Sequence, residues 1–176
     1  MDEKNLIMLA KAGDRDAFCA LYSLYKDRLY RYAFYKLGNQ QDAEDAVSDC
    51  VLSAFIQVGS LKKAEAFSAW IFRILYCTCS SIAKAQIERR KTENIDDLEN
   101  NLCSDFTNSI EKTELQQALS VLKESEREIV LLSVIGGFKS REIGKIMDMT
   151  SGTVRSNLSR SLKKMKDFLE SDDNEK

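Results

Sequence analysis

The sequence predicts an all-α protein with two small helical domains, joined by a flexible acidic linker, and a helix-turn-helix in the second domain. Three observations lead to this fold class. The 176 residues contain no proline, whereas a soluble chain usually carries about 5% proline, mostly in turns and loops. Apolar residues recur at three- and four-residue steps, which is the period of an amphipathic helix. No segment alternates apolar and polar residues as a half-buried strand would.

The first predicted domain, residues 1–91, contains three helical periods whose apolar faces can bury one another. They cover residues 18–37, 43–58 and 67–82. Asp14 is a good N-cap for the first of these helices. The third helical period is followed by a basic segment. The apolar positions of the first period are Phe18, Leu21, Tyr22, Tyr25, Leu29, Tyr32, Ala33 and Leu37.

The composition changes after this domain. Residues 92–111 contain six acidic residues and no Lys or Arg, together with several Asn and Ser. Segments of high net charge and low hydrophobicity do not bury enough apolar surface to fold alone. We therefore predict a flexible acidic linker over 92–111.

The second predicted domain, residues 112–170, begins with a helix over 115–122, and a polar tail follows at 171–176. Ser125 to Glu128 has the pattern of a capping box before the apolar run 129–132. Two glycines at 136–137 end that helix. Two more helices follow, and the last one is expected to bury a stripe of Val154, Leu158, Leu162, Met165 and Leu169.

The last two helices, 140–147 and 151–162, are separated by three residues and have the dimensions of a helix-turn-helix. The second helix of that motif enters the major groove by its N-terminal end. Residues 151–166 contain five basic residues and no acid. Arg155 is the best candidate for a base contact, because a bidentate pair between arginine and guanine is the commonest specific contact. Lys163, Lys164 and Lys166 lie later in the helix and are expected to meet phosphates. The predicted DNA-contacting residues are Ser151, Thr153, Arg155, Ser156, Ser159, Arg160 and Lys163.

The first domain also carries charged patches. Asp42, Asp45 and Asp49 lie three and four residues apart, so they share one helix face; a solvated surface is the usual meaning of such a stripe. A basic group comprises Lys62, Lys63, Lys84, Arg89, Arg90 and Lys91. The aromatic residues Trp70, Phe72 and Tyr76 lie between its two halves, and this mixture suits unstacked single-stranded nucleic acid. Trp70 itself is more readily explained as a core residue.

The composition excludes several kinds of chemistry. Without histidine the chain has no Ser-His-Asp or Cys-His nucleophile pair and no zinc site with a histidine ligand. We predict no enzymatic activity, no cofactor and no metal. The five cysteines form no disulfide framework, no signal segment is evident, and no apolar run approaches the roughly 20 residues of a membrane span. These features predict a cytoplasmic protein.

The formal net charge of −2 is a sum of opposed parts. Residues 1–91 contain 14 basic and 11 acidic residues, and the linker contributes six negative charges. The basic charge is therefore concentrated on the segments that are candidates for DNA contact.

Four motifs in order resemble those of one known family. They are Phe18-x-x-Leu21-Tyr22, Asp42-Ala43-Glu44-Asp45, Phe67-x-x-Trp70-Ile71 and Ser151-Gly152-Thr153-Val154-Arg155-Ser156. Their spacing is similar to that of the two-domain bacterial RNA polymerase sigma factors of the extracytoplasmic-function (ECF) group. The resemblance extends over residues 6–169.

The resemblance implies a subunit that binds core RNA polymerase and directs initiation at specific promoters. Asp42, Asp45 and Asp49 would then face the polymerase. The basic residues between Lys62 and Lys91 would recognise and open the minus-ten element, and the helix from Ser151 would read the minus-thirty-five element. The linker would thread through the polymerase toward the RNA exit channel. An anti-sigma protein is an expected partner, and a small-molecule substrate is not expected.

The sequence departs from the family pattern in three respects. Ser48-Asp49 replaces a frequent Gln-Glu, Cys77 and Ser81 replace a frequent Asn and Asp, and Lys123 replaces a frequent proline. Two other hypotheses remain open from the residues alone. The chain could be a helix-turn-helix regulator that binds duplex DNA without polymerase, or an adaptor whose basic faces bind acidic protein.

Overall fold

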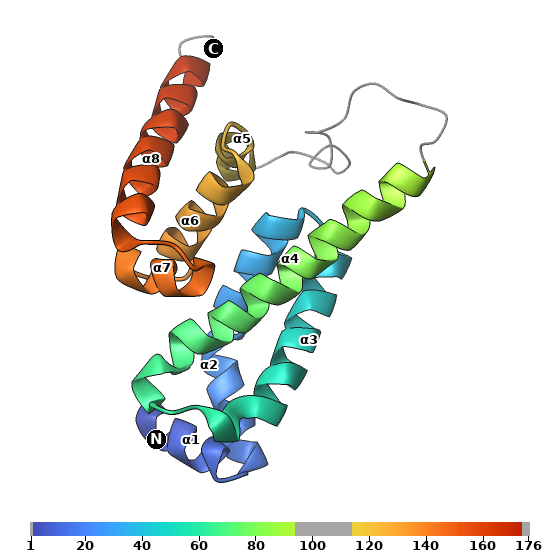
Figure 1. Ribbon diagram of the computed structural model, residues 1–176, viewed down its shortest axis with the longest axis vertical. Coiled ribbons are helices and arrows are strands. Elements are labelled where there is room, and N and C mark those ends of the chain that lie inside the picture. Colours follow the sequence, from blue (N-terminus) through green and yellow to red (C-terminus); the bar gives the residue numbers. More distant parts are fainter. Residues whose placement is uncertain (1, 94–113, 174–176) are drawn as a thin grey trace.

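The computed structural model describes residues 2–93 and 114–173, and every regular element within these ranges is helical (Figure 1). The all-α prediction is therefore confirmed. The predicted linker, 92–111, lies almost entirely outside the described residues. The helices form an N-terminal domain and a C-terminal domain, and the predicted boundaries between them stay a prediction.

The N-terminal domain contains four α-helices and two short 3-10 turns. These elements are α1 (Glu3–Lys11), α2 (Arg15–Leu37), α3 (Gln40–Gln57), the turns Val58–Ser60 and Ala64–Ala66, and α4 (Phe67–Glu93). The sequence did not predict α1, because three buried positions in nine residues are too few to establish a period. The hydroxyl group of Tyr25 on α2 donates a hydrogen bond to the carboxylate of Glu3, which ties α1 to the domain.

Both predicted ends of α2 are confirmed. The Asp14 carboxylate accepts a hydrogen bond from the backbone N–H of Ala17 at 3.0 Å, as an N-cap should. Gly38 follows the helix with φ 80°, and its N–H donates to the carbonyl of Phe34. A residue without a Cβ adopts this left-handed conformation at little cost.

The core of this domain lies where α2, α3 and α4 pack together. The ring of Tyr25 meets the ring of Phe67 edge-on at 5.3 Å. By length and composition alone, residues 64–89 could cross a membrane, in contrast to the prediction from the sequence that no apolar run is long enough. One face of this helix, including Phe67, Ile71 and Leu75, is buried in the core, so we interpret it as a core helix.

The C-terminal domain contains α5 (Glu114–Ser120), α6 (Glu124–Val134), α7 (Ser140–Met147) and α8 (Ser151–Asp173). The predicted start of α6 is wrong. The helix begins before Ser125, and the Glu126 carboxylate accepts the backbone N–H of Lys123 at 3.1 Å. Glu128 was predicted to be the glutamate of the capping box. It is instead a buried residue in the second turn of α6.

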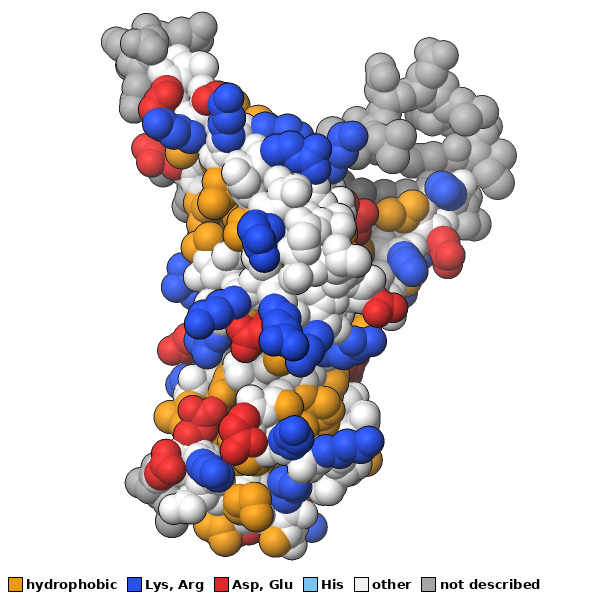
Figure 2. Space-filling model, turned by 60° about the vertical axis from the view of Figure 1, so that its left-hand side comes forward, with side chains coloured by type: hydrophobic (Ala, Val, Ile, Leu, Met, Phe, Trp, Pro, Cys, Tyr) orange, Lys and Arg blue, Asp and Glu red, His pale blue; other side chains and the backbone are white. Residues whose placement is uncertain are grey.

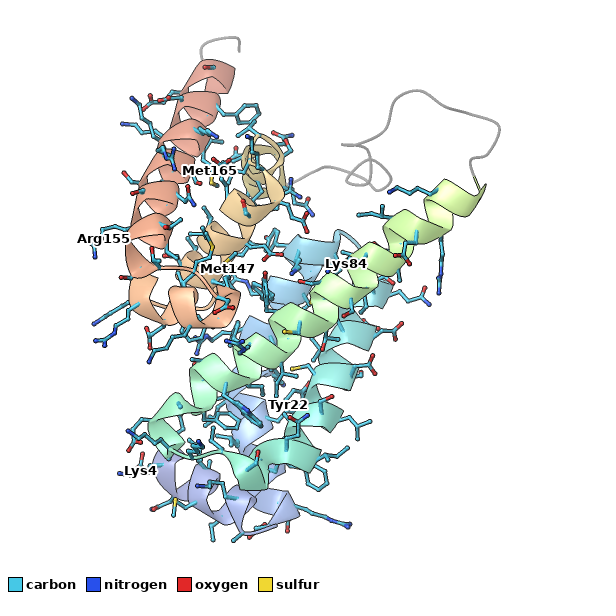
Figure 3. The ribbon with its side chains drawn as sticks, in the orientation of Figure 1. Lys4, Tyr22, Lys84, Met147, Arg155 and Met165 are labelled. Atoms are coloured by element: carbon cyan, nitrogen blue, oxygen red, sulfur yellow. The ribbon has the colours of Figure 1, made fainter. Side chains whose placement is uncertain are left out.

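The predicted apolar stripe of α8 is partly wrong. Val154 and Met165 are buried, but Leu162 is exposed and the neighbouring Ser161 is buried in its place. Figure 3 shows Met165 between α8 and the helices α5 and α6. The inward-facing positions of α8 are spaced by four and then by three residues. A uniform spacing of four residues therefore predicts that Leu162 is buried, whereas it is exposed.

The two domains pack directly against each other, which the sequence did not predict. α7 lies against α4, and α6 lies against α2 (Figure 1). The helix-turn-helix is therefore held beside the longest helix of the N-terminal domain.

Candidate nucleic-acid interface

The turn of the helix-turn-helix is held by backbone and side-chain hydrogen bonds. Asp148 ends α7 with φ 59°, and the N–H of Met149 donates to the carbonyl of Gly144 at 2.8 Å. The hydroxyl oxygen of Thr150 accepts the N–H of Thr153 at 3.1 Å and so caps α8. The start of α8 is thereby fixed at a defined angle to α7.

The N-terminal half of α8 projects its polar side chains into solvent. Arg155 is exposed and points away from the body of the molecule (Figure 3). Ser156, Ser159 and Lys163 are also exposed, and Ser151 is half-buried. The structure therefore presents most of the predicted DNA-contacting residues together along one helix.

Several predicted contact residues already have partners within the chain. The hydroxyl groups of Thr153 and Thr150 are 2.8 Å apart. Arg160 donates to the side-chain oxygen of Asn157 at 2.6 Å, so it would have to give up this hydrogen bond to contact DNA through the same N–H group. Lys164 pairs with Glu126 at 2.8 Å and lowers the pKa of that carboxyl. Lys164 therefore stabilises the contact between α8 and α6 in this structure.

The structure adds basic residues that are not among the predicted DNA-contacting residues. Lys139, Arg141 and Lys145 are exposed on or beside α7. Figure 2 shows Lys and Arg side chains gathered on the face that α8 turns to the viewer. The first helix of a helix-turn-helix crosses the DNA backbone, so the basic side chains on α7 could have been inferred from the motif itself.

The basic group predicted for the minus-ten element is divided by the structure. Lys62 and Lys63 are exposed in the loop before α4, whereas Lys84, Arg89 and Lys91 are exposed near its other end. At 1.5 Å per residue, the helix from Phe67 to Lys84 is about 26 Å long. The two halves therefore form separate patches along one helix. The side chain of Arg90 lies outside the described residues.

The aromatic residues between these patches differ in exposure. Phe72 is fully buried and meets Phe138 of the C-terminal domain, so the suggestion that it faces single-stranded nucleic acid does not fit this structure. Trp70 is half-buried and packs at a tilt against Phe67, 5.7 Å between ring centroids. Tyr76 is also half-buried. Burial raises the pKa of Tyr76 to about 12, and the charge of Glu128 acts in the same direction.

The three carboxylates of the acidic stripe on α3 also differ in exposure. Asp45 and Asp49 are exposed, but the Asp42 carboxylate is half-buried and accepts hydrogen bonds from the side chains of Asn39 and Gln86. Asp42 therefore links α3 to α4.

Two exposed apolar residues, Leu52 and Ile56, continue the line of Asp45 and Asp49 along α3 at steps of three and four residues, and Ile56 is 72% exposed. Because of this spacing they share a face with the two carboxylates. The sequence pattern alone could not show that these two side chains are exposed.

Two family models match the chain, one after the other along the sequence. "Sigma-70 region 2" matches residues 21–86, and "Sigma-70, region 4" matches residues 112–165. ECF RNA polymerase sigma factor SigW of Bacillus subtilis is 27% identical over 174 residues, covering 89% of this chain and 91% of that protein. ECF RNA polymerase sigma factor SigM of Mycobacterium tuberculosis (strain Erdman) is 30% identical over 152 residues, covering 85% and 76%.

Two solved structures have a similar fold. CnrH, solved in complex with the cytosolic domain of CnrY, gives a TM-score of 0.71 at 19% identity and covers 97% of this chain and 98% of CnrH. The sigma factor RpoE of Bartonella quintana, solved with the anti-sigma factor NepR, gives 0.71 at 23% identity and covers 87% and 96%. The two regions in order and the full-length relatives agree with the helical architecture: the chain belongs to the ECF RNA polymerase sigma factors.

Proposed function

We propose that the two domains of this sigma factor divide the work of promoter recognition between α8, which reads the minus-thirty-five element, and α4, which meets the minus-ten element. The observation that carries this assignment is the exposed basic start of α8, held at a fixed angle by the turn at Asp148. Arg155 would contact base edges there. Lys139, Arg141 and Lys163 would contact phosphates and set the register on the duplex.

The minus-ten assignment rests on the two basic patches at the ends of α4. Lys62 and Lys63 would hold the backbone at one end, and Lys84, Arg89 and Lys91 at the other. The separation of these patches suits a strand that runs along the helix, because phosphate contacts give affinity without needing a single compact site. As a sigma factor the chain supplies binding energy and performs no bond chemistry.

The test of the overall function uses the purified full chain with core RNA polymerase. We expect a stable complex and initiation at a promoter identified by mapping transcripts after overexpression. If the chain forms no complex with the core at low micromolar concentration, the proposal fails. Binding of the free chain to a palindromic duplex as a dimer, without polymerase, would instead support a conventional helix-turn-helix regulator.

We further propose that the outward face of α3 docks on the core polymerase. Asp45 and Asp49 would meet a basic surface, and Leu52 and Ile56 would bury apolar area beside them. Charge complementarity steers association, and exposed apolar residues on a polar surface often mark an interface.

Replacing Asp45 and Asp49 by lysine should weaken core binding by roughly tenfold or more, because like charges facing each other across an interface cost several kcal/mol. The affinity for fluorescently labelled core is the measurement. The matched control reverses Asp16 and Asp27, two exposed carboxylates on α2. Equal losses in the two double variants would show that only net charge matters and that α3 is not the docking face.

Two further assignments follow from the family. Sigma factors of the ECF group are soluble transcription factors, and we propose a cytoplasmic location for this chain, because it must meet RNA polymerase. We also propose an anti-sigma partner; RpoE of Bartonella quintana, which shares the fold, was solved with one. A protein of that class should compete with core polymerase for the purified chain.

A further inference from the structure

The two arginines in the first half of α8 differ in how their side chains are held. Arg155 makes no side-chain hydrogen bond or ion pair with the described residues. Arg160 donates from Nε to the carbonyl of Ser156 at 3.3 Å and from Nη2 to the side-chain oxygen of Asn157 at 2.6 Å. Arg160 is nevertheless exposed. Its guanidinium group is therefore fixed in position while it remains open to solvent.

The two hydrogen bonds of Arg160 use only one edge of its guanidinium group. This group is planar and carries five N–H groups, and those of Nε and Nη2 lie side by side along one edge. The opposite edge, formed by Nη1 and the other N–H of Nη2, has no partner among the described residues. That edge has the forked geometry that matches O6 and N7 of guanine. The contacts within the helix therefore leave open the part of Arg160 that is able to read a base.

Arg155 and Arg160 lie on either side of the stripe of α8 that faces away from the core. Small exposed residues form this stripe at steps of three and four: Gly152, Ser156 and Ser159. With 3.6 residues per turn, the two arginines are turned by about 140° from each other around the helix axis, and the stripe lies between them. The helix is therefore able to approach a duplex closely with one arginine on each side.

The side chain that holds Arg160 is uncharged. Asn157 offers an amide oxygen, which accepts a hydrogen bond without cancelling the charge of the guanidinium. Two basic residues later in α8 are held by carboxylates instead, in the pairs Lys164–Glu126 at 2.8 Å and Lys166–Glu170 at 3.4 Å. A carboxylate beside Arg160 would repel DNA phosphates, because like charges facing each other across an interface weaken binding. Asn157 thus orients the guanidinium and preserves its attraction for DNA.

We propose that Asn157 is a positioning residue for promoter recognition, which holds Arg160 so that the free edge of its guanidinium contacts a guanine of the minus-thirty-five element. The inference rests on the proposed function of α8. A side chain with many rotamers loses conformational freedom when it is ordered at an interface, and this loss reduces affinity. Arg160 has lost part of that freedom before DNA binds, so less is lost on binding. Asn157 is not among the DNA-contacting residues predicted from the sequence, and it acts through Arg160.

The experiment measures the affinity of the reconstituted holoenzyme for the mapped promoter. Asn157→Ala should weaken binding by roughly two- to tenfold, the cost of ordering one free arginine side chain. Arg160→Ala should weaken it further and remove the preference for guanine at one position of the minus-thirty-five element. Alanine favours a helix more than asparagine does, so the midpoint of thermal unfolding should not fall in Asn157→Ala. That comparison separates an effect on binding from a loss of folding.

A double variant shows whether Asn157 acts through Arg160. In the Arg160→Ala background, Asn157→Ala should have no further effect, because no guanidinium is left to orient. The salt dependence of binding should be the same for the wild type and Asn157→Ala, since this change removes no charge.

Two other substitutions of Asn157 test its acceptor oxygen. Asn157→Leu has a similar size without the acceptor and should behave like Asn157→Ala. Asn157→Asp keeps the acceptor, so it should retain the wild-type discrimination between base pairs while its negative charge weakens binding to every sequence alike.

Three outcomes would overturn the proposal. If Asn157→Ala binds as tightly as the wild type, Arg160 needs no positioning. An effect of Asn157→Ala that persists in the double variant would show that Asn157 contacts DNA itself. If Arg160→Ala weakens binding to all sequences equally, Arg160 contacts phosphate and not a base. All three leave the sigma function standing, whereas a wild-type holoenzyme that does not bind the promoter contradicts the proposed function itself.

Discussion

Replacing Gly144 by alanine is expected to destabilise the C-terminal domain and to disrupt the helix-turn-helix. A Cβ at this position would lie 2.5 Å from the carbonyl oxygen of Met149, closer than real Cβ contacts. The clash is with backbone, which cannot rotate away, and the same turn is closed by the hydrogen bond from the N–H of Met149 to the carbonyl of Gly144. We expect a loss of about 1–3 kcal/mol in the free energy of unfolding, the usual cost of overpacking.

The matched control is Gly152→Ala, in the first turn of α8. A Cβ there meets only the side-chain oxygen of Thr150, at 3.9 Å, and alanine is favoured over glycine in a helix by up to about 1 kcal/mol. Thermal unfolding of both full-length variants is the measurement, with each kcal/mol moving the midpoint by roughly 2–4 °C. A Gly144→Ala protein as stable as the wild type would show that α7 and α8 can separate at no cost.

Replacing Arg155 by alanine is expected to reduce the affinity of the holoenzyme for its promoter by about 5- to 150-fold, the equivalent of the 1–3 kcal/mol that a bidentate base contact contributes. Arg155 is exposed near the start of α8, points away from the protein, and follows the capped turn at Thr150. Binding of the reconstituted holoenzyme to the mapped promoter is the measurement, repeated with each base pair of the minus-thirty-five element changed in turn.

Two control variants give this prediction its specificity. Arg155→Lys keeps the charge but not the forked geometry, so it should recover little of the discrimination between base pairs. Lys166→Ala removes an exposed charge that pairs with Glu170 at 3.4 Å and should affect all sequences alike. If Arg155→Ala weakens binding uniformly, with no loss of discrimination, the residue contacts phosphate and another side chain reads the bases.

Much of the fold could be predicted because most of its helices carry their own signals. The N-cap at Asp14 and the glycine at position 38 define the ends of α2 by local geometry alone. α1 was missed because it is short, and its burial depends on α2. The register of α8 was partly misassigned, because the step from Leu158 to the next buried position is three residues and not four, so Ser161 is buried and Leu162 is exposed.

The candidate site was predictable to a similar extent. The charge and the small residues at the start of α8 belong to one segment, so the sequence alone located that surface. The exposure of Leu52 and Ile56 was not predictable, because the same residue types usually fill a core. The pairing of Lys164 with Glu126 also depends on how α6 and α8 cross.

The sequence by itself therefore determined the helical class, the helix-turn-helix and the segregation of charge, because each depends on residues close together in the chain. Only the tertiary structure revealed that the domains close on each other. Glu128 was assigned to a helix cap from its local pattern, but it is buried against Lys36, a residue more than ninety positions earlier. Such a contact stabilises both charges only after two separate domains have folded, and no local pattern of residues records it.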